Sequence, residues 1–254
     1  MISDRPDLDD ARLASPLGRV SPVVKLAVAI VWLGGLALTT GIAPPLILAV
    51  AAAIAGLTVG RIPPRAFAGA LAPLGFAALM IGVSNTLFAA ANGDPTAAEL
   101  LRVGPVRIAE DAAGGGVALA CRVIAIAIVG AVFSLTTDPT YLVDSLVQQA
   151  RVSPRFAYGA LAAYQAIPRF GEDLATLRQA RRVRGLRGGW HPRLLVGVLV
   201  LAIRHADRMA LAMDARAFGS GPRTFYRPIR WTWLDLVVGA GAAAILVVAL
   251  AAPA

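Results

Sequence analysis

Two arginines, Arg184 and Arg216, have the sequence surroundings best suited to binding another protein through ion pairs and hydrogen bonds. They occur in the short motifs Val183-Arg184-Gly185 and Ala215-Arg216-Ala217, with small or aliphatic neighbours on both sides. An unobstructed guanidinium can bind a carboxylate through two parallel hydrogen bonds, and it can also donate to carbonyl oxygens. The repeated pattern therefore predicts two contact points for a partner's carboxylates or carbonyls. It predicts no catalytic residue.

Helix ends are the elements expected to position this arginine pair. The two residues are 32 positions apart, which on one continuous helix would separate them by roughly 48 Å. Glycine and proline interrupt such a helix, at Gly185, Gly188, Gly189 and Pro192. A first helix should therefore end near Gly185 and a second should begin near Pro192. Each arginine then lies at the C-terminal end of its own helix, where the helix dipole favours a cation.

The two helices differ in their patterns. Pro168 is expected to kink or interrupt the first one, after an apolar stretch from Phe156 to Ile167. The second presents small and flexible side chains on one face, where another helix can approach closely. These are Ala202, Ala206, Met209, Ala210, Met213 and Ala217. The pattern predicts a crossed pair of amphipathic helices with arginine tips.

Composition places this helix pair in a membrane protein. The chain is 57% hydrophobic and only 15% charged, which is too apolar for an ordinary soluble domain. Its charge excess is concentrated, because fifteen of its 24 basic residues lie between Arg151 and Arg230. A nucleic-acid-binding protein would spread such residues, with aromatic ones, over a soluble surface rather than between apolar spans. We therefore expect an all-α, polytopic membrane protein in contact with the lipid bilayer, and no nucleic-acid partner.

Apolar runs predict about five transmembrane helices, or seven if the stretches at 156–167 and 194–203 also enter the bilayer. The expected spans cover about 23–40, 45–60, 66–91, 115–135 and 231–250. Lys25 lies close enough to the end of the first span to reach the interface, and residues 92–113 are expected to form a loop. Residues 1–137 thus hold a polar tail and four spans, 138–230 a cytoplasmic helical segment, and 231–254 the last span. Arginines beside the short loops predict a cytoplasmic N-terminus.

Two polar side chains inside the spans are further candidates. Arg122 is the most costly intramembrane charge, and such a residue is a functional candidate by default. Contact with a substrate is one interpretation of Arg122; donation to a neighbouring helix, or reaching toward the outer face, is the more favoured one. Asn85 is interpreted as a polar link between helices. No metal site or cofactor is predicted, since His191 and His205 lack carboxylate or cysteine partners at ligand spacing.

Catalysis is not expected from this chain. Lys25 is its only lysine, so the Gly-Lys-Ser/Thr core of a phosphate-binding loop cannot occur. A Mg²⁺-dependent membrane transferase would bind the metal ion through acidic residues such as Asp7, Asp9 and Asp10. The sequence has no second acidic cluster to complete such a site. ATP hydrolysis, if it drives this protein, must therefore take place on another chain.

Four segments together resemble the transmembrane coupling subunit, or T component, of energy-coupling factor (ECF) transporters, a family that also serves cobalt, nickel and biotin uptake. The segments are spread over most of the chain. They are Ser21-Pro22-Val23-Val24-Lys25-Leu26, Thr136-Thr137-Asp138-Pro139, Ile167-Pro168 together with residues 179–185, and residues 212–219. The sequence departs from the family pattern at Val183, Asp214 and Ala217, where alanine, glutamate and glycine are common.

The resemblance implies a role and a set of partners. It implies that Arg184 and Arg216 dock in grooves on two ATP-binding-cassette (ABC) ATPases, as a homodimer or heterodimer. A separate substrate-binding membrane subunit, the S component, would bind a vitamin or a transition-metal ion, and all of these would lie at the cell inner (plasma) membrane. A conventional ABC importer permease is the alternative, although such a subunit usually presents one cytoplasmic helix to an ATPase rather than two.

Overall fold

A computed structural model describes residues 15–93, 98–103, 106–186, 191–219, 221, 224–225 and 227–252. Asp7, Asp9, Asp10, Gly188 and Gly189 lie outside these described residues. The chain divides into two compact units. One unit consists of Val143–Ile229, and the other of the described residues up to Leu142 together with those from Arg230 onward.

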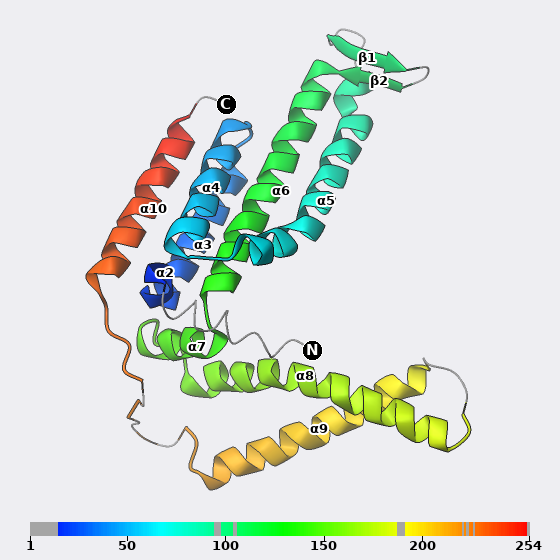
Figure 1. Cartoon of the computed structure of the whole chain (residues 1–254), viewed down its shortest axis with the longest axis vertical. Helices are drawn as coiled ribbons and strands as arrows, with labels where there is room; N and C mark the ends of the chain where they lie inside the picture. The colour runs from blue at the N-terminus through cyan, green and yellow to red at the C-terminus, as the bar shows by residue number, and fades with distance from the viewer. Residues whose placement is uncertain are drawn as a thin grey trace. The chain divides into compact units, whose positions relative to one another are not determined.

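Helices of the second unit, the membrane unit, form where the apolar runs occur (Figure 1). They are α3 (Pro22–Leu38), α4 (Ala43–Ile54) continued by the π-helix η1 (Ala55–Val59), α5 (Pro64–Phe88), α6 (Glu110–Thr136) and α10 (Trp233–Ala251). Among the described residues, three helical stretches are long and apolar enough to cross a membrane: Pro64–Gly93, Glu110–Thr136 and Trp233–Ala251. Pro22–Leu38 and Ala43–Val59 are shorter apolar helices. The all-α, polytopic fold is therefore confirmed.

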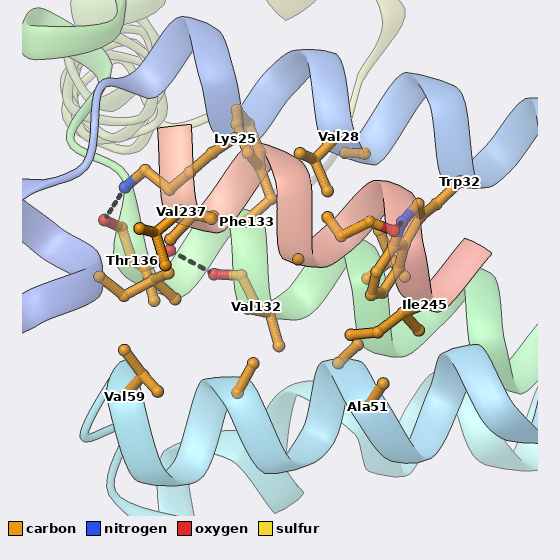
Figure 2. Close-up of a pocket in the computed structure, with 18 residues that line it drawn as sticks. Lys25, Val28, Trp32, Ala51, Val59, Val132, Phe133, Thr136, Val237 and Ile245 are labelled. Carbon is orange, nitrogen blue, oxygen red and sulfur yellow. Dashed lines mark hydrogen bonds between the residues drawn. The ribbon is translucent and has the colours of Figure 1, made fainter. Parts of the chain in front are cut away.

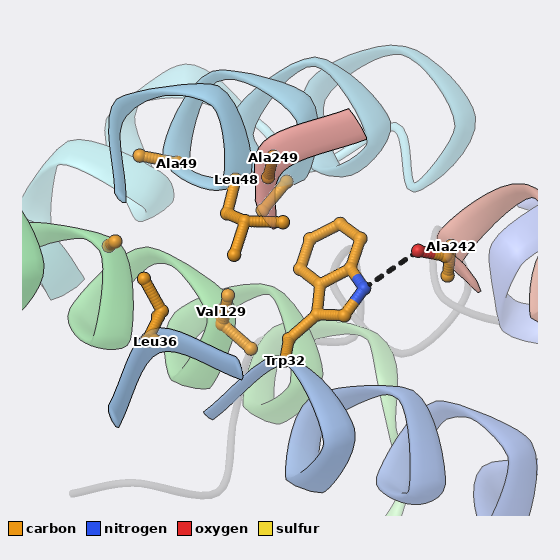
Figure 3. Packing of buried hydrophobic residues seen from close by; sticks show 9 residues of the cluster. Trp32, Leu36, Leu48, Ala49, Val129, Ala242 and Ala249 are labelled. Atoms are coloured by element: carbon orange, nitrogen blue, oxygen red, sulfur yellow. Dashed lines mark hydrogen bonds between the residues drawn. The ribbon is translucent and has the colours of Figure 1, made fainter. Parts of the chain in front are cut away.

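The core of the membrane unit lies between four of its helices (Figure 3). Helix α6 packs against α5 and α4, and α10 packs against α3 and α4. Trp32 of α3 projects into this core, where its indole N–H donates to the carbonyl oxygen of Ala242 in α10 at 3.0 Å. The other buried members of the cluster come from α3, α4, α6 and α10; they are Leu36, Leu48, Ala49, Ala52, Ala125, Val129 and Ala249.

Buried polar groups connect the ends of these helices. Lys25 does not reach toward an interface as predicted: its side chain is 8% exposed, and its ammonium donates to the carbonyl oxygen of Thr136 at 2.8 Å. Thr136 is the last residue of α6, so the cation lies where the helix dipole is negative and a carbonyl lacks its helical partner. Asp235, near the start of α10, accepts the main-chain N–H of Ser21 at 2.7 Å.

Residues 92–113 were expected to form a loop, and this expectation is wrong. The helix α5 is followed by a short 3₁₀ turn, η2 (Ala90–Gly93), and by an antiparallel hairpin of β1 (Glu99–Val103) and β2 (Val106–Ala109). An ion pair of 2.6 Å between Arg107 and Glu99 joins the two strands. Helix α6 begins at Glu110, five residues before the predicted start, since Glu110 and Asp111 suit the positive end of a helix dipole.

The described part of the N-terminal polar tail contains a short helix. Pro16–Arg19 forms the short helix α2, and the Ser15 hydroxyl caps it by accepting the N–H of Gly18 at 2.9 Å. Leu17 and Val20 are buried. This part of the tail therefore packs as a helix of the membrane unit.

The remaining unit contains two long helices, α8 (Pro154–Val183) and α9 (Pro192–Ala215), preceded by α7 (Pro139–Gln148), which begins in the membrane unit. Pro168 was expected to kink or interrupt the first long helix; it does not interrupt it, because α8 continues through this residue. A proline removes one helical hydrogen bond, and a helix of 30 residues with many others can retain its continuity. The two helices cross where Gly197 of α9 meets Leu177 of α8 (Figure 1).

Candidate functional site

Both predicted arginines occupy the same position of the same local structure. Arg184 is the C-cap residue of α8, and Arg216 is the C-cap residue of α9. In each case the following residue has a left-handed backbone: φ is 72° at Gly185 and 52° at Ala217. The chain therefore turns sharply away immediately after each arginine, which leaves the guanidinium-bearing residue at the extreme end of its helix.

Main-chain hydrogen bonds close both helix ends in the Schellman pattern. At the first end, the N–H of Leu186 donates to the carbonyl of Arg181 at 3.1 Å and the N–H of Gly185 donates to Arg182 at 3.0 Å. At the second end, Phe218 donates to Met213 at 3.0 Å and Ala217 donates to Asp214 at 2.9 Å. These bonds satisfy carbonyls that a helix end would otherwise leave unpaired, so both arginine positions have a defined geometry.

The two ends differ in what surrounds them. Val183 is 89% exposed and Leu186 is 50% exposed, so the tip at Arg184 carries exposed apolar side chains beside its guanidinium. Ala215 and Arg216 are also exposed, whereas Phe218 is half-buried. Within the described part of the chain, no ion pair involves either tip arginine. Both arginines are thus available to an external carboxylate or carbonyl.

The structure does not bring the two arginines together. The C-terminal end of α9 lies beside the start of α8, because Arg155 donates to the carbonyl of Gly219 at 3.2 Å. Arg184 lies at the other end of α8, and a helix of 30 residues is about 45 Å long. The tips are therefore at opposite ends of the helix pair and suit two separated contact sites on a partner.

Five of the six residues predicted for the small-residue face of α9 lie toward α8, and the sixth, Ala217, lies beyond the end of α9. Together the two helices line an open groove of about 440 Å³. Ala202, Ala206, Met209, Ala210 and Met213 of α9 face Gly159, Ala162, Ala163, Ala166 and Phe170 of α8 across it. The exposed apolar stretch at 156–167 belongs to α8 and the stretch at 194–203 belongs to α9, so both stretches are parts of this helix pair.

Arg122 and Asn85 lie in the membrane unit and are not part of this site. Arg122 of α6 donates a hydrogen bond to the main-chain carbonyl of Thr39, the residue that ends α3. Its Nε atom is buried and has no hydrogen-bond partner among the described residues. Asn85 lies on α5 near Gly115 of α6. Arg122 thus links α6 to the end of α3 in this structure.

A second cavity lies within the membrane unit (Figure 2). Its volume is about 280 Å³, and its lining side chains, from α2, α3, α4, η1, α6 and α10, are almost entirely apolar. Lys25 and Trp32 are among them, but both use their polar hydrogens to bind main-chain carbonyls of neighbouring helices. These two side chains therefore stabilise helix contacts, and the arginine tips remain the better candidate site.

The two cap geometries make a paired prediction about local stability. Ala217→Gly replaces an alanine that has a left-handed backbone, and Gly185→Ala places an alanine in that conformation. The left-handed conformation destabilises alanine relative to glycine by about 1 kcal/mol, after subtraction of the larger entropy that glycine has in the unfolded chain. Amide hydrogen exchange of the peptide covering each helix end should therefore become about fivefold slower in Ala217→Gly and about fivefold faster in Gly185→Ala. Exchange that changes in the same direction for both variants would contradict this description of the caps.

Comparisons with known proteins identify the family. The sequence model of the CbiQ family, described as cobalt transport protein, matches residues 14–226. A putative ABC transporter ATP-binding protein of Bifidobacterium longum is 28% identical over 214 residues, which are 77% of this chain and 26% of that protein. The energy-coupling factor transporter transmembrane protein EcfT of Listeria innocua is 26% identical over 156 residues, 54% of this chain and 58% of that protein.

A further relative is the protein of the same name from Heliobacterium modesticaldum, which is 29% identical over 157 residues, 54% of this chain and 58% of that protein. The chain thus spans about a quarter of the first relative's length and 58% of the length of the two EcfT proteins. The CbiQ match covers most of the chain and includes both arginine motifs. The chain therefore belongs to the CbiQ family and is an integral membrane protein of the energy-coupling factor T-component type.

Proposed function

We propose that this protein couples two ABC ATPases to a separate substrate-binding membrane subunit, the S component, in an importer for a vitamin or a transition-metal ion. The observation that carries the proposal is the pair of exposed arginines, Arg184 and Arg216, each held as the C-cap of a Schellman-closed helix end. The tips lie at opposite ends of one helix pair. A movement of either ATPase would therefore be transmitted along α8 or α9.

Both tips suit a cytoplasmic, protein-bound position. The guanidinium of each can donate two parallel hydrogen bonds to a carboxylate in an ATPase groove. Basic residues concentrate in the unit that contains α8 and α9, which supports a cytoplasmic location for residues 138–230 and for the N-terminus. The first relative is named an ATP-binding protein, and the part similar to this chain occupies 26% of it. In that relative, a segment similar to this chain is part of a protein named for ATP binding. This supports an ABC ATPase as the partner of the present chain.

Purification in a mild detergent from cells that contain the partners tests this function by its stoichiometry. We expect one copy of this chain, two ABC ATPase subunits and one further small membrane protein, identified by mass spectrometry and by the mass of the complex. A conventional permease would instead give two copies of this chain, or one with a homologous permease, together with two ATPases. Recovery of either of those assemblies would overturn the proposed function.

A further inference from the structure

The two arginine tips differ in how they are held. At the Arg184 tip, a Cβ added to Gly185 would meet no atom within 4 Å, and Val183 is 89% exposed. At the Arg216 tip, the residues that follow α9 contact the beginning of α8. Figure 1 shows this end of α9 on the side of the unit where α8 begins. The local hydrogen bonds of the two caps are alike, so the difference arises from tertiary contacts.

Tyr158 is at the centre of these contacts. Its ring meets the ring of Phe218 edge to face, with centroids 6.3 Å apart and planes at 77°. Its hydroxyl donates to a carboxylate oxygen of Asp144 in α7 at 2.7 Å. Phe218 is two residues after Arg216, and its main-chain N–H donates to the carbonyl oxygen of Met213 in the cap of α9. Tyr158 therefore joins three elements, α7, α8 and the turn that presents Arg216.

Arg155 makes a second contact to the same turn. It donates to the carbonyl of Gly219 at 3.2 Å. Gly219 has a φ of 79°, and a Cβ at this position would collide with the side chain of Arg155. Glycine is thus required both by the backbone conformation and by the close approach of Arg155. Two side chains from the first turns of α8, Arg155 and Tyr158, therefore contact the turn after Arg216.

We infer that Tyr158 is a positioning residue that holds the Arg216 tip in place for its partner, whereas the Arg184 tip has no corresponding brace among the described residues. This inference rests on the proposed docking of both tips to ATPases. The edge-to-face ring contact and the hydrogen bond to a carboxylate both stabilise this position of the tip. Because both are partly buried rather than fully buried, their combined loss should change the equilibrium between the held and the released tip by about tenfold.

The position of the tip can be measured separately from docking. In a Cys121→Ser chain, nitroxide labels at Ala160→Cys and Ala212→Cys, both exposed positions on α8 and α9, report the distance between the start of α8 and the end of α9. Tyr158→Ala should broaden this distance distribution. Tyr164→Ala is the matched control, since Tyr164 is on the same helix and 57% exposed. A distribution that stays narrow in Tyr158→Ala would overturn the inference, whatever happens to ATPase binding.

The consequence for docking is measured in two backgrounds. With Arg184→Glu, ATPase binding depends on the Arg216 tip, and Tyr158→Ala should weaken it by a further factor of about ten. With Arg216→Glu, Tyr158→Ala should change binding less than twofold. Tyr158→Phe keeps the ring contact and should restore most of the binding lost in Tyr158→Ala.

These measurements separate the role of Tyr158 in positioning the Arg216 tip from the proposed docking of both tips to ATPases. Equal loss of binding in both backgrounds would show a general structural role for Tyr158 and would overturn the inference. A broadened distance with unchanged binding in the Arg184→Glu background would overturn it as well. If Arg184→Glu and Arg216→Glu both leave ATPase binding intact, the proposed function fails, and the label distances still decide whether Tyr158 holds the tip.

Discussion

Replacement of both tip arginines, Arg184→Glu with Arg216→Glu, should abolish binding of the ATPases while the chain still inserts into the membrane. Both residues are exposed and at helix ends, so their loss removes no buried contact of this chain. An arginine at the centre of an interface is typically worth 2 kcal/mol or more, and charge reversal adds repulsion from the partner's carboxylates. The expected loss of affinity for the pair is about a thousandfold or more.

The matched control for charge reversal is Arg169→Glu with Arg204→Glu. These arginines are exposed on the shafts of α8 and α9, and their replacement makes the same change in net charge. ATPase retention on an affinity column, substrate uptake and membrane content should be measured for both pairs. Wild-type retention and uptake in the tip variant, or equal losses in both pairs, would contradict specific docking at the tips.

Asp235→Ala should cause a large loss of stability in the membrane unit. Asp235 is 4% exposed and acts at the starts of two helices. One carboxylate oxygen accepts the N–H of Ser21, before α3, at 2.7 Å; the other accepts the N–H of Thr232 at 2.8 Å and its hydroxyl at 3.0 Å, within the capping box of α10. Alanine would leave the N–H of Ser21, a residue only 3% exposed, without this acceptor.

The expected cost of Asp235→Ala is about 3 kcal/mol, the sum of a lost buried hydrogen bond to a charged group and a lost helix cap. For a chain of this size, the unfolding temperature in detergent should fall by roughly 6–12 °C. Asp235→Asn retains one acceptor oxygen and should lose about half as much. Asp207→Ala, at an exposed position of α9, is the control and should change the unfolding temperature by less than about 2 °C. Equal unfolding temperatures for Asp235→Ala and the control would show that this link is dispensable.

Features set by local sequence could be predicted. Uninterrupted apolar runs mark the membrane helices, because about 20 such residues are needed to cross a bilayer. Proline after serine marks the starts of α3 and α8, and Gly185 marks the end of α8 with the left-handed residue that such an end requires. Ala217 shows the limit of that rule, because it adopts the same conformation without being glycine.

Features set by distant contacts could not be predicted. The composition of residues 92–113 predicts a loop, because these residues include several charged ones, whereas the pairing of β1 with β2 depends on register rather than on composition. Lys25 was expected to reach an interface, but Thr136, 111 positions away, supplies an acceptor inside the unit. Tyr158 and Asp144 gave no sequence signal, since a tyrosine and a carboxylate 14 positions apart become partners only when α7 and α8 are folded.

Photo-crosslinking from the two helix ends tests the central claim most directly. Benzoylphenylalanine is placed at Val183 and Ala215, the equivalent last helical residues before Arg184 and Arg216, and at Tyr164 on the shaft of α8 as the control. In the assembled complex, each end position should crosslink to an ABC ATPase, and a chain labelled at both should yield a product containing two ATPase subunits. Crosslinks to ATPase from Tyr164 but from neither helix end, or a doubly labelled chain that never captures a second ATPase subunit, would contradict the account.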